Sequence, residues 1–137
     1  MKYHMLTISS NPNNILEVES YLKKLDFDFR FDAEKYADIL ISLTEAVNNA
    51  IIHGNKSDES KHVNIHVREK ENGIAFCVSD EGDGFNPSYV KDPTCEANIE
   101  CCGGRGVYIM KALADDIIFD DNGSKVEMYF DLTTQSA

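Results

Sequence analysis

The chain of 137 residues has the length of one domain and can bury a core without disulfide bonds. Its formal net charge is −11, and the absence of any basic run excludes nucleic acid as an expected direct ligand. No apolar run is long enough to span a membrane and no leader is recognisable, so a cytoplasmic protein without a membrane anchor is expected. An acidic surface suits solubility and contact with basic faces of partner proteins.

The first part of the chain predicts a strand followed by a helix. Residues 2–8 have the composition of a short strand. Asn11 is a suitable helix cap, and Pro12 suits the first helical position, where its missing N–H is not needed. The predicted helix runs to about Leu25, with apolar residues recurring on one face.

A second helix is predicted over residues 32–53, with Asp32 as its cap and Gly54 ending it in a left-handed turn. One face is an apolar stripe at helical spacing, formed by Tyr36, Leu40, Leu43, Val47 and Ala50. Another face is polar at the same spacing, with Asp38, Ser42, Glu45 and Asn49. A solvated face would show the same pattern, but asparagine is a poor helix former, and the pair Asn48-Asn49 favours a face that binds something.

The rest of the chain predicts a polar loop, a hairpin with an Asn-Gly turn signal, a long loop, a helix and a final hairpin. These elements cover residues 55–60, 61–78, 86–102, 106–114 and 116–132. A structureless loop as long as the segment 86–102 is uncommon unless it is functional. The cysteines fit no metal-ligand spacing: Cys77, Cys95, Cys101 and Cys102.

Three short segments carry chemistry. Glu45 and Asn49 stand four residues apart, so a helix points both at one centre, where a carboxylate can act as a base and an amide oxygen can bind Mg²⁺. Asp80 opens Asp-Glu-Gly-Asp-Gly, where a buried carboxylate can accept the adenine amino proton and glycines allow close backbone approach. An acidic surface turn is the alternative interpretation of this segment.

The third segment is Gly103-Gly-Arg-Gly106, which opens a predicted helix. Unpaired N–H groups and the positive dipole end of a helix attract phosphate. Arg105 contacts phosphate or a partner in one interpretation and is a plain surface arginine in the other. Together, the three segments predict an ATP site.

In this order, the segments resemble the N, G1 and G2 boxes of the GHKL ATPase/kinase superfamily. Gly-Gly-Arg-Gly-Val-Tyr-Ile-Met followed by Lys-Ala-Leu-Ala-Asp115 is most similar to the bacterial anti-sigma-factor serine/threonine kinases. The resemblance implies the Bergerat fold, an α+β two-layer sandwich with a mixed, mostly antiparallel sheet and helices on one face. It also implies a single kinase domain over residues 1–137, with an ATP lid at about 86–103.

The resemblance assigns a role to each motif position. It makes Glu45 the general base and Asn49 the ligand of Mg²⁺. Gly123-Ser124-x-Val126 resembles the closing G-T-x-V of the family, with a serine hydroxyl in place of threonine. The nucleotide-binding positions that it implies are Asn49, Asp80, Gly82, Gly84, Gly104, Arg105, Gly106 and Ser124.

The function implied by the resemblance is that of an ATP- and Mg²⁺-dependent kinase. It would phosphorylate a STAS-type anti-anti-sigma protein and sequester a sigma factor, and the family also suggests a homodimer. The alternative is a non-catalytic module that only sequesters a partner, against which the presence of Glu45, Asn49 and Asp80 argues. A histidine-kinase ATPase domain is a third interpretation, and the chain has no room for the phosphoacceptor helices of that class.

Overall fold

The computed structural model describes residues 3–82, 104–120 and 124–133. Their strands form one five-stranded sheet in the order β1-β2-β3-β5-β4. The strands are β1 (Tyr3–Ser9), β2 (His62–Lys70), β3 (Gly73–Ser79), β4 (Asp116–Asp120) and β5 (Lys125–Asp131). The helices are α1 (Ile15–Phe29), α2 (Ala33–Asn49) and α4 (Gly104–Leu113), with a short 3₁₀ turn η1 (Pro12–Asn14) before α1 and a π turn η2 (Ala50–Gly54) after α2.

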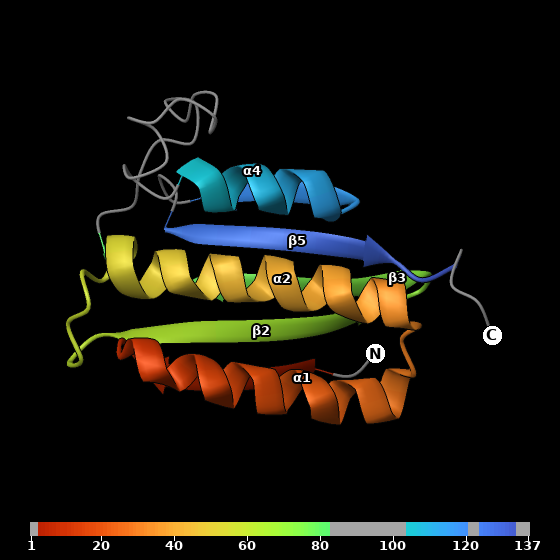
Figure 1. The fold of residues 1–137 in the computed structure, drawn as a ribbon, viewed down its shortest axis with the longest axis horizontal. Coiled ribbons are helices and arrows are strands. Elements are labelled where there is room, and N and C mark those ends of the chain that lie inside the picture. The colour runs from red at the N-terminus through yellow and green to blue at the C-terminus, as the bar shows by residue number, and fades with distance from the viewer. Residues whose placement is uncertain (1–2, 83–103, 121–123, 134–137) are drawn as a thin grey trace.

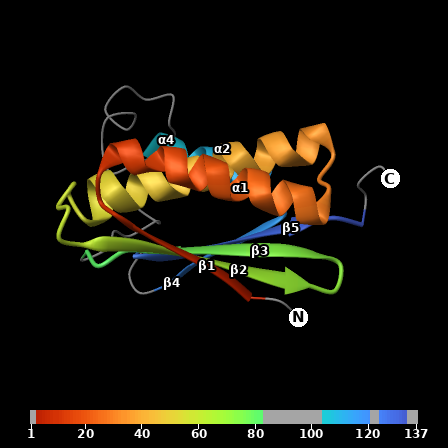
Figure 2. The same ribbon diagram turned by 90° about the horizontal axis from the view of Figure 1, so that it is seen from below.

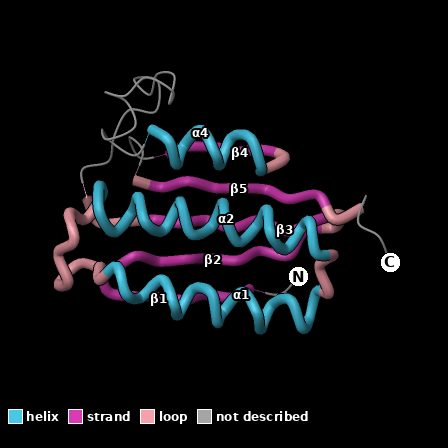
Figure 3. The backbone as a smooth tube through the Cα atoms, viewed as in Figure 1, coloured by secondary structure: helices cyan, strands magenta, loops and turns pink. Residues whose placement is uncertain are grey.

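The three helices lie side by side on one face of the sheet, with α2 between α1 and α4 (Figure 1, Figure 2). The tube view separates the same two layers by colour (Figure 3). The predicted α+β sandwich with helices on one face is therefore confirmed. All four strand pairings are antiparallel, so the described strands contain no parallel pair of the kind a mixed sheet would have.

Strand alternation builds the sheet side of the core. On β2, Val63, Ile65 and Val67 point to the helices and are fully buried, while the residues between them face the other way. Phe76 of β3 and Phe130 of β5 meet edge to face, with ring centroids 6.0 Å apart. The side of the sheet that carries the helices is thus a continuous apolar surface.

Helix α2 is buried on more sides than the sequence predicts, because it packs between two other helices. Leu43, Val47 and Ala50 of the predicted stripe are buried, whereas Tyr36 and Leu40 are only partly so. Ser42, predicted on the polar face, is fully buried, and its hydroxyl has no hydrogen-bond partner among the described residues. The polar face is therefore not a solvated face along its whole length.

The helix ends show which local signals worked. Asp32 caps α2 as predicted, its carboxylate accepting a hydrogen bond of 2.7 Å from the Lys35 N–H. Helix α1 runs past the predicted end at Leu25, because Arg30 closes it in a left-handed conformation with φ 53°. None of the described helices has the length and apolar character needed to cross a membrane.

The end of α2 differs from the prediction. The helix passes into the π turn η2, and Gly54 lies within that turn rather than ending the helix in a left-handed conformation. The left-handed residues near this end of α2 are Lys56 and Ser57, with φ 54° and 57°. Gly54 has a different role, which depends on a contact with a distant part of the chain.

Replacing Phe76 with alanine should destabilise the fold by about 3–5 kcal/mol, the range for truncating a fully buried aromatic side chain. The matched control is Phe27→Ala on α1, since Phe27 is 84% exposed and its removal should change the free energy of unfolding by less than about 0.5 kcal/mol. Urea denaturation followed by circular dichroism measures both values. Equal effects of the two substitutions would contradict this account of the core.

Candidate nucleotide-binding site

Helix α2 and the first turn of α4 bring two of the predicted motifs into contact. A Cβ built on Gly106 would lie 2.8 Å from Glu45 Oε2 and 3.0 Å from Asn49 Nδ2. A Cβ at position 106 would displace the Glu45 carboxylate and crowd the Asn49 amide, so glycine lets α4 lie this close to both side chains as they stand. The predicted base, the predicted metal ligand and the predicted phosphate-binding helix start therefore form one cluster.

The amide of Asn49 is the least satisfied group in this cluster. Its Nδ2 atom is buried and has no hydrogen-bond partner among the described residues. A buried amide without a partner is unfavourable by about 1–3 kcal/mol, so this group is available to a ligand or an ordered water. A half-turn of the amide exchanges its nitrogen and oxygen, so it can offer a donor to phosphate or an oxygen to Mg²⁺. The residues present fit the group that the sequence predicts.

The second motif forms a tight turn at the end of β3, which we call the Asp80 turn (residues 80–82). The Asp80 N–H donates to the Ser124 carbonyl at 2.9 Å, and the Gly82 N–H donates to Asp80 Oδ1 at 2.8 Å. Burial raises the pKa of the Asp80 carboxyl, while the Gly82 hydrogen bond and the charge of Lys61 partly oppose that shift. The carboxylate is thus half-buried and already oriented.

Gly54 allows the Asp80 turn to lie against the end of α2. A Cβ on Gly54 would lie 2.3 Å from Asp80 Oδ2, and a Cβ on Gly82 would lie 1.8 Å from the Gly54 carbonyl oxygen. Neither position tolerates another residue without movement of the backbone or of Asp80. The sequence analysis interpreted Gly54 as a helix stop and missed this role, because the contact joins residues that are distant in sequence.

A small cavity connects the two halves of the site. It has a volume of about 20 Å³ and is lined by Ala46, Asn49, Ala50, Val78, Asp80, Met110, Phe119, Ser124 and Val126. The predicted positions Asn49, Asp80 and Ser124 therefore face one space. That space is about the size of one water molecule, so an adenine ring would require its walls to move apart.

Part of the predicted site lies outside the described residues. Gly84 and the predicted lid, residues 86–103, lie outside the described residues, as does the side chain of Arg105. The backbone of Gly104, Arg105 and Gly106 forms the first turn of α4, slightly earlier than the predicted start at about Gly106. The roles of all these positions stay predictions.

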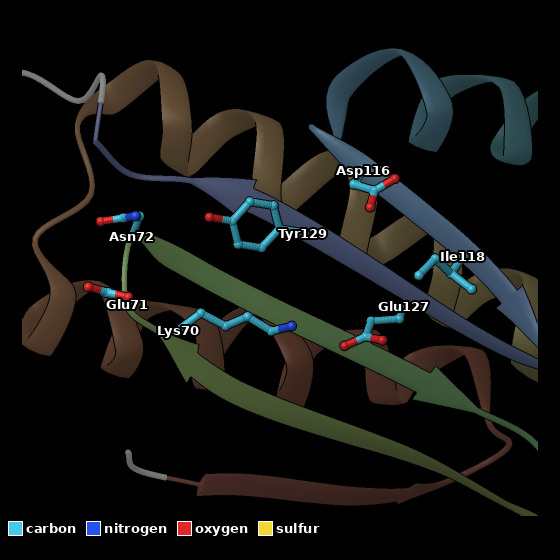
Figure 4. Close-up of a pocket in the computed structure, with 7 residues that line it drawn as sticks. All are labelled: Lys70, Glu71, Asn72, Asp116, Ile118, Glu127 and Tyr129. Carbon is cyan, nitrogen blue, oxygen red and sulfur yellow. The ribbon is translucent and has the colours of Figure 1, made fainter.

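A larger hollow lies on the opposite face of the sheet, which the helices leave uncovered (Figure 4). It has a volume of about 390 Å³ and includes Lys70, Ile118, Glu127 and Tyr129. Glu127 is already paired with Arg68, with 3.0 Å between Oε1 and Nη2. None of the predicted site residues lines this hollow, so its size does not make it the better candidate.

Comparison with known proteins identifies the family of the chain. Residues 8–130 match the histidine kinase-like ATPase domain family. The chain belongs to that family. Its similarity to the relatives described next also confirms the predicted resemblance to the GHKL anti-sigma-factor kinases. Membership of an ATPase domain family implies that the chain binds ATP.

Two relatives illustrate the range of similarity. The anti-sigma F factor of Clostridium perfringens is 32% identical over 123 residues, which cover 82% of this chain and 81% of that protein. The serine-protein kinase RsbW of Bacillus subtilis is 25% identical over 127 residues, covering 84% and 76%.

A solved structure supports the fold. The crystal structure of the RsbU and RsbW domains of a Mycobacterium tuberculosis protein matches with a TM-score of 0.67 and 17% identity. The match covers 96% of this chain and 32% of that longer chain. At this identity it shows the fold alone.

Replacing Asp80 with asparagine should separate stability from binding. Because the pKa of Asp80 is raised in the folded chain, its ionised form destabilises the fold above the ordinary aspartate pKa of about 4. Asp80→Asn should therefore be more stable than wild type at neutral pH, with a difference that shrinks as the pH falls towards about 4. ATP binding should weaken by about 1–3 kcal/mol, the range for a lost charge-assisted hydrogen bond.

Urea denaturation between pH 4 and 8 and titration calorimetry with ATP and GTP measure these effects. Asp58→Asn is a control of opposite sign, because hydrogen bonds from Ser60 lower the pKa of Asp58. That variant should be less stable than wild type at neutral pH and should bind ATP normally. Unchanged ATP affinity in Asp80→Asn would remove Asp80 from the binding site.

Proposed function

We propose that this chain is an ATP-dependent protein serine/threonine kinase that acts as an anti-sigma factor in a partner switch. The observation that carries the proposal is the contact of Glu45 and Asn49 with Gly106, beside a cavity that Asp80 also lines. The names of the relatives, anti-sigma F factor and serine-protein kinase RsbW, support the same activity and role. A partner switch means that phosphorylation decides which of two proteins the kinase holds.

Different residues of the chain would bind the adenine, the phosphates and the metal ion. Asp80, Gly82, Gly84 and Ser124 would hold the adenine, and Asp80 would select it because guanine offers no amino proton at that position. The first turn of α4 (Gly104–Gly106) would face the phosphates with its N–H groups. Asn49 would hold Mg²⁺, which when bound neutralises phosphate charge.

Glu45 is the proposed general base. It would accept the proton of a serine or threonine hydroxyl on the partner as that oxygen bonds to the γ-phosphorus of ATP and the bond to the bridging oxygen breaks, releasing ADP. Phosphoryl transfer depends mainly on positioning and charge neutralisation, so a small site suffices. The contact of Glu45 with Gly106 supports this role, because it puts the carboxylate at the proposed phosphate-binding turn.

The proposed protein partners are a STAS-type anti-anti-sigma protein, as phosphoacceptor, and a sigma factor. The net charge of −11 supports binding to a sigma factor through the basic surfaces that DNA-binding proteins carry. These partners would place the kinase in the cytoplasm. A homodimer is part of the same proposal, since it is a property suggested by the family.

Replacing Glu45 with glutamine tests catalysis without changing the shape of the site. The variant should keep ATP and partner binding but lose phosphoryl transfer by roughly a hundred- to ten-thousand-fold, the range for a missing general base. Glu34→Gln is the matched control, because Glu34 is an exposed glutamate in the first turn of the same helix. Radiolabelled ATP and a co-purified STAS-type partner provide the assay.

Two outcomes would change the proposal. If Glu45→Gln transfers phosphate at the wild-type rate, Glu45 is not the base. If wild type binds ATP and its partner but never labels that partner, the chain is a module that only sequesters proteins.

Asn49→Ala should abolish the Mg²⁺ dependence of ATP binding and stop turnover while leaving the fold intact. Stability should be retained because the substitution removes a buried amide nitrogen that has no partner among the described residues. Asn48→Ala is the control at the neighbouring position and should retain Mg²⁺ dependence. Calorimetry with and without Mg²⁺, together with thermal unfolding, distinguishes these results, and Mg²⁺-dependent labelling by Asn49→Ala would contradict the assignment.

A further inference from the structure

Asn55 is a buried polar residue to which the sequence assigns no role. It follows the π turn η2, and the residue is only 1% exposed although it opens a segment predicted as a polar loop. Buried amides are retained where their hydrogen bonds are made, so the question is what these bonds connect.

All polar atoms of the Asn55 side chain are in use. Nδ2 donates to Ser10 Oγ at 2.8 Å and to the His62 carbonyl at 3.1 Å. Oδ1 accepts from the Glu81 backbone N–H at 2.8 Å. Turning the amide over would set two donors against each other at Glu81, so its orientation is fixed.

These bonds join parts of the chain that are far apart in sequence. Ser10 follows β1, His62 begins β2, and Glu81 is the central residue of the Asp80 turn. Ser10 is itself fully buried and donates through its hydroxyl to the Lys61 carbonyl at 2.8 Å. Asn55 thus fastens the Asp80 turn to the end of the α2–η2 segment and to two strands.

The backbone around Asn55 has two uncommon features, a π turn before it and two left-handed residues after it. Its N–H donates to the Ala50 carbonyl at 2.8 Å, the wider spacing of a π turn, and π turns occur frequently at functional sites. Lys56 and Ser57, which follow it, are both left-handed. Such conformations are unfavourable and persist only where surrounding contacts fix them.

Two other hydrogen bonds hold the Asp80 turn, but neither joins it to the α2–η2 segment. The Asp80 N–H donates to the Ser124 carbonyl at 2.9 Å, just before β5. The Glu81 carboxylate accepts from the His62 N–H of β2 and lies 3.8 Å from His62 Nδ1 in an exposed ion pair. Gly54 and Gly82 touch without room for a Cβ, so a small shift of the turn would move the Asp80 carboxylate.

We propose that Asn55 is a positioning residue for nucleotide recognition: its Oδ1 atom holds the Asp80 turn in register with the helix that carries Glu45 and Asn49. This inference rests on the proposed ATP site. It makes the base-binding carboxylate and the catalytic helix one rigid unit, joined through an amide that itself touches no nucleotide.

Three variants test the proposal in the full chain. Asn55→Ala removes all three hydrogen bonds. Asn55→Asp keeps an oxygen that accepts from the Glu81 N–H but loses both donations, and Ser10→Ala removes one partner of Nδ2 on the side away from the turn. ATP and GTP affinities, melting temperature and amide exchange at Glu81 and Gly82 are measured for each.

Asn55→Ala should weaken ATP binding about tenfold, which corresponds to one lost hydrogen bond to the turn, and should reduce the preference for ATP over GTP. Asn55→Asp should retain most of the affinity even though its melting temperature falls. Ser10→Ala should lower the melting temperature. Its ATP affinity should stay within about twofold of wild type, a difference in binding free energy of about 0.4 kcal/mol.

The proposal is wrong if Asn55→Ala and Ser10→Ala lose affinity equally, or if Asn55→Asp binds no better than Asn55→Ala. Failure of wild type to bind ATP would instead overturn the proposed function. Amide exchange without nucleotide then still decides whether Asn55 holds the turn: Asn55→Ala should speed exchange at Glu81 and Gly82 more than Ser10→Ala does. Equal exchange in the two variants would contradict the positioning role.

Discussion

The candidate site depends on close approach of the backbone at three glycines, where a side chain would separate the elements. At Gly106, the first turn of α4 meets two polar side chains of α2, and at Gly54 and Gly82 the Asp80 turn meets the end of that helix. An additional carbon atom would meet backbone at Gly82 and would have to displace polar side chains at Gly54 and Gly106. The site therefore depends on where side chains are missing as much as on where carboxylates and amides are present, because these gaps set the distances among the polar groups.

The architecture explains why α2 can serve as the centre of this arrangement. The sheet carries the described helices on one face, and α2 lies between the other two, so its position is fixed by a helix on each side and by the sheet against which it packs (Figure 1, Figure 2). Precise catalytic geometry is easier to maintain on such a helix than on a loop. The buried amide of Asn49 and the desolvated carboxyl of Asp80 both lower the stability of the fold. The apolar packing around α2 offsets this cost.

Periodicity predicted the elements well, since each strand and helix has a face that must be buried. Alternation on β2 and helical spacing on α2 are local patterns, and so is the separation of Glu45 from Asn49 by one turn. The burial of Ser42 was not predictable, because it follows from tertiary packing around α2 and not from the helical spacing. The roles of Gly54 and Asn55 also depend on contacts with residues around position 80, which no local pattern encodes.

The pairing of β1 with β2 has a consequence for the order of folding. Strands β2 and β3 are joined by a short turn and can pair within microseconds, whereas Ser9 finds its partner His62 only after both intervening helices are accommodated. Contacts of high sequence separation form late, so the junction of Ser10, Asn55 and Glu81 should close after the β2–β3 hairpin. On the ribosome, the N-terminal strand must wait unpaired until β2 has emerged.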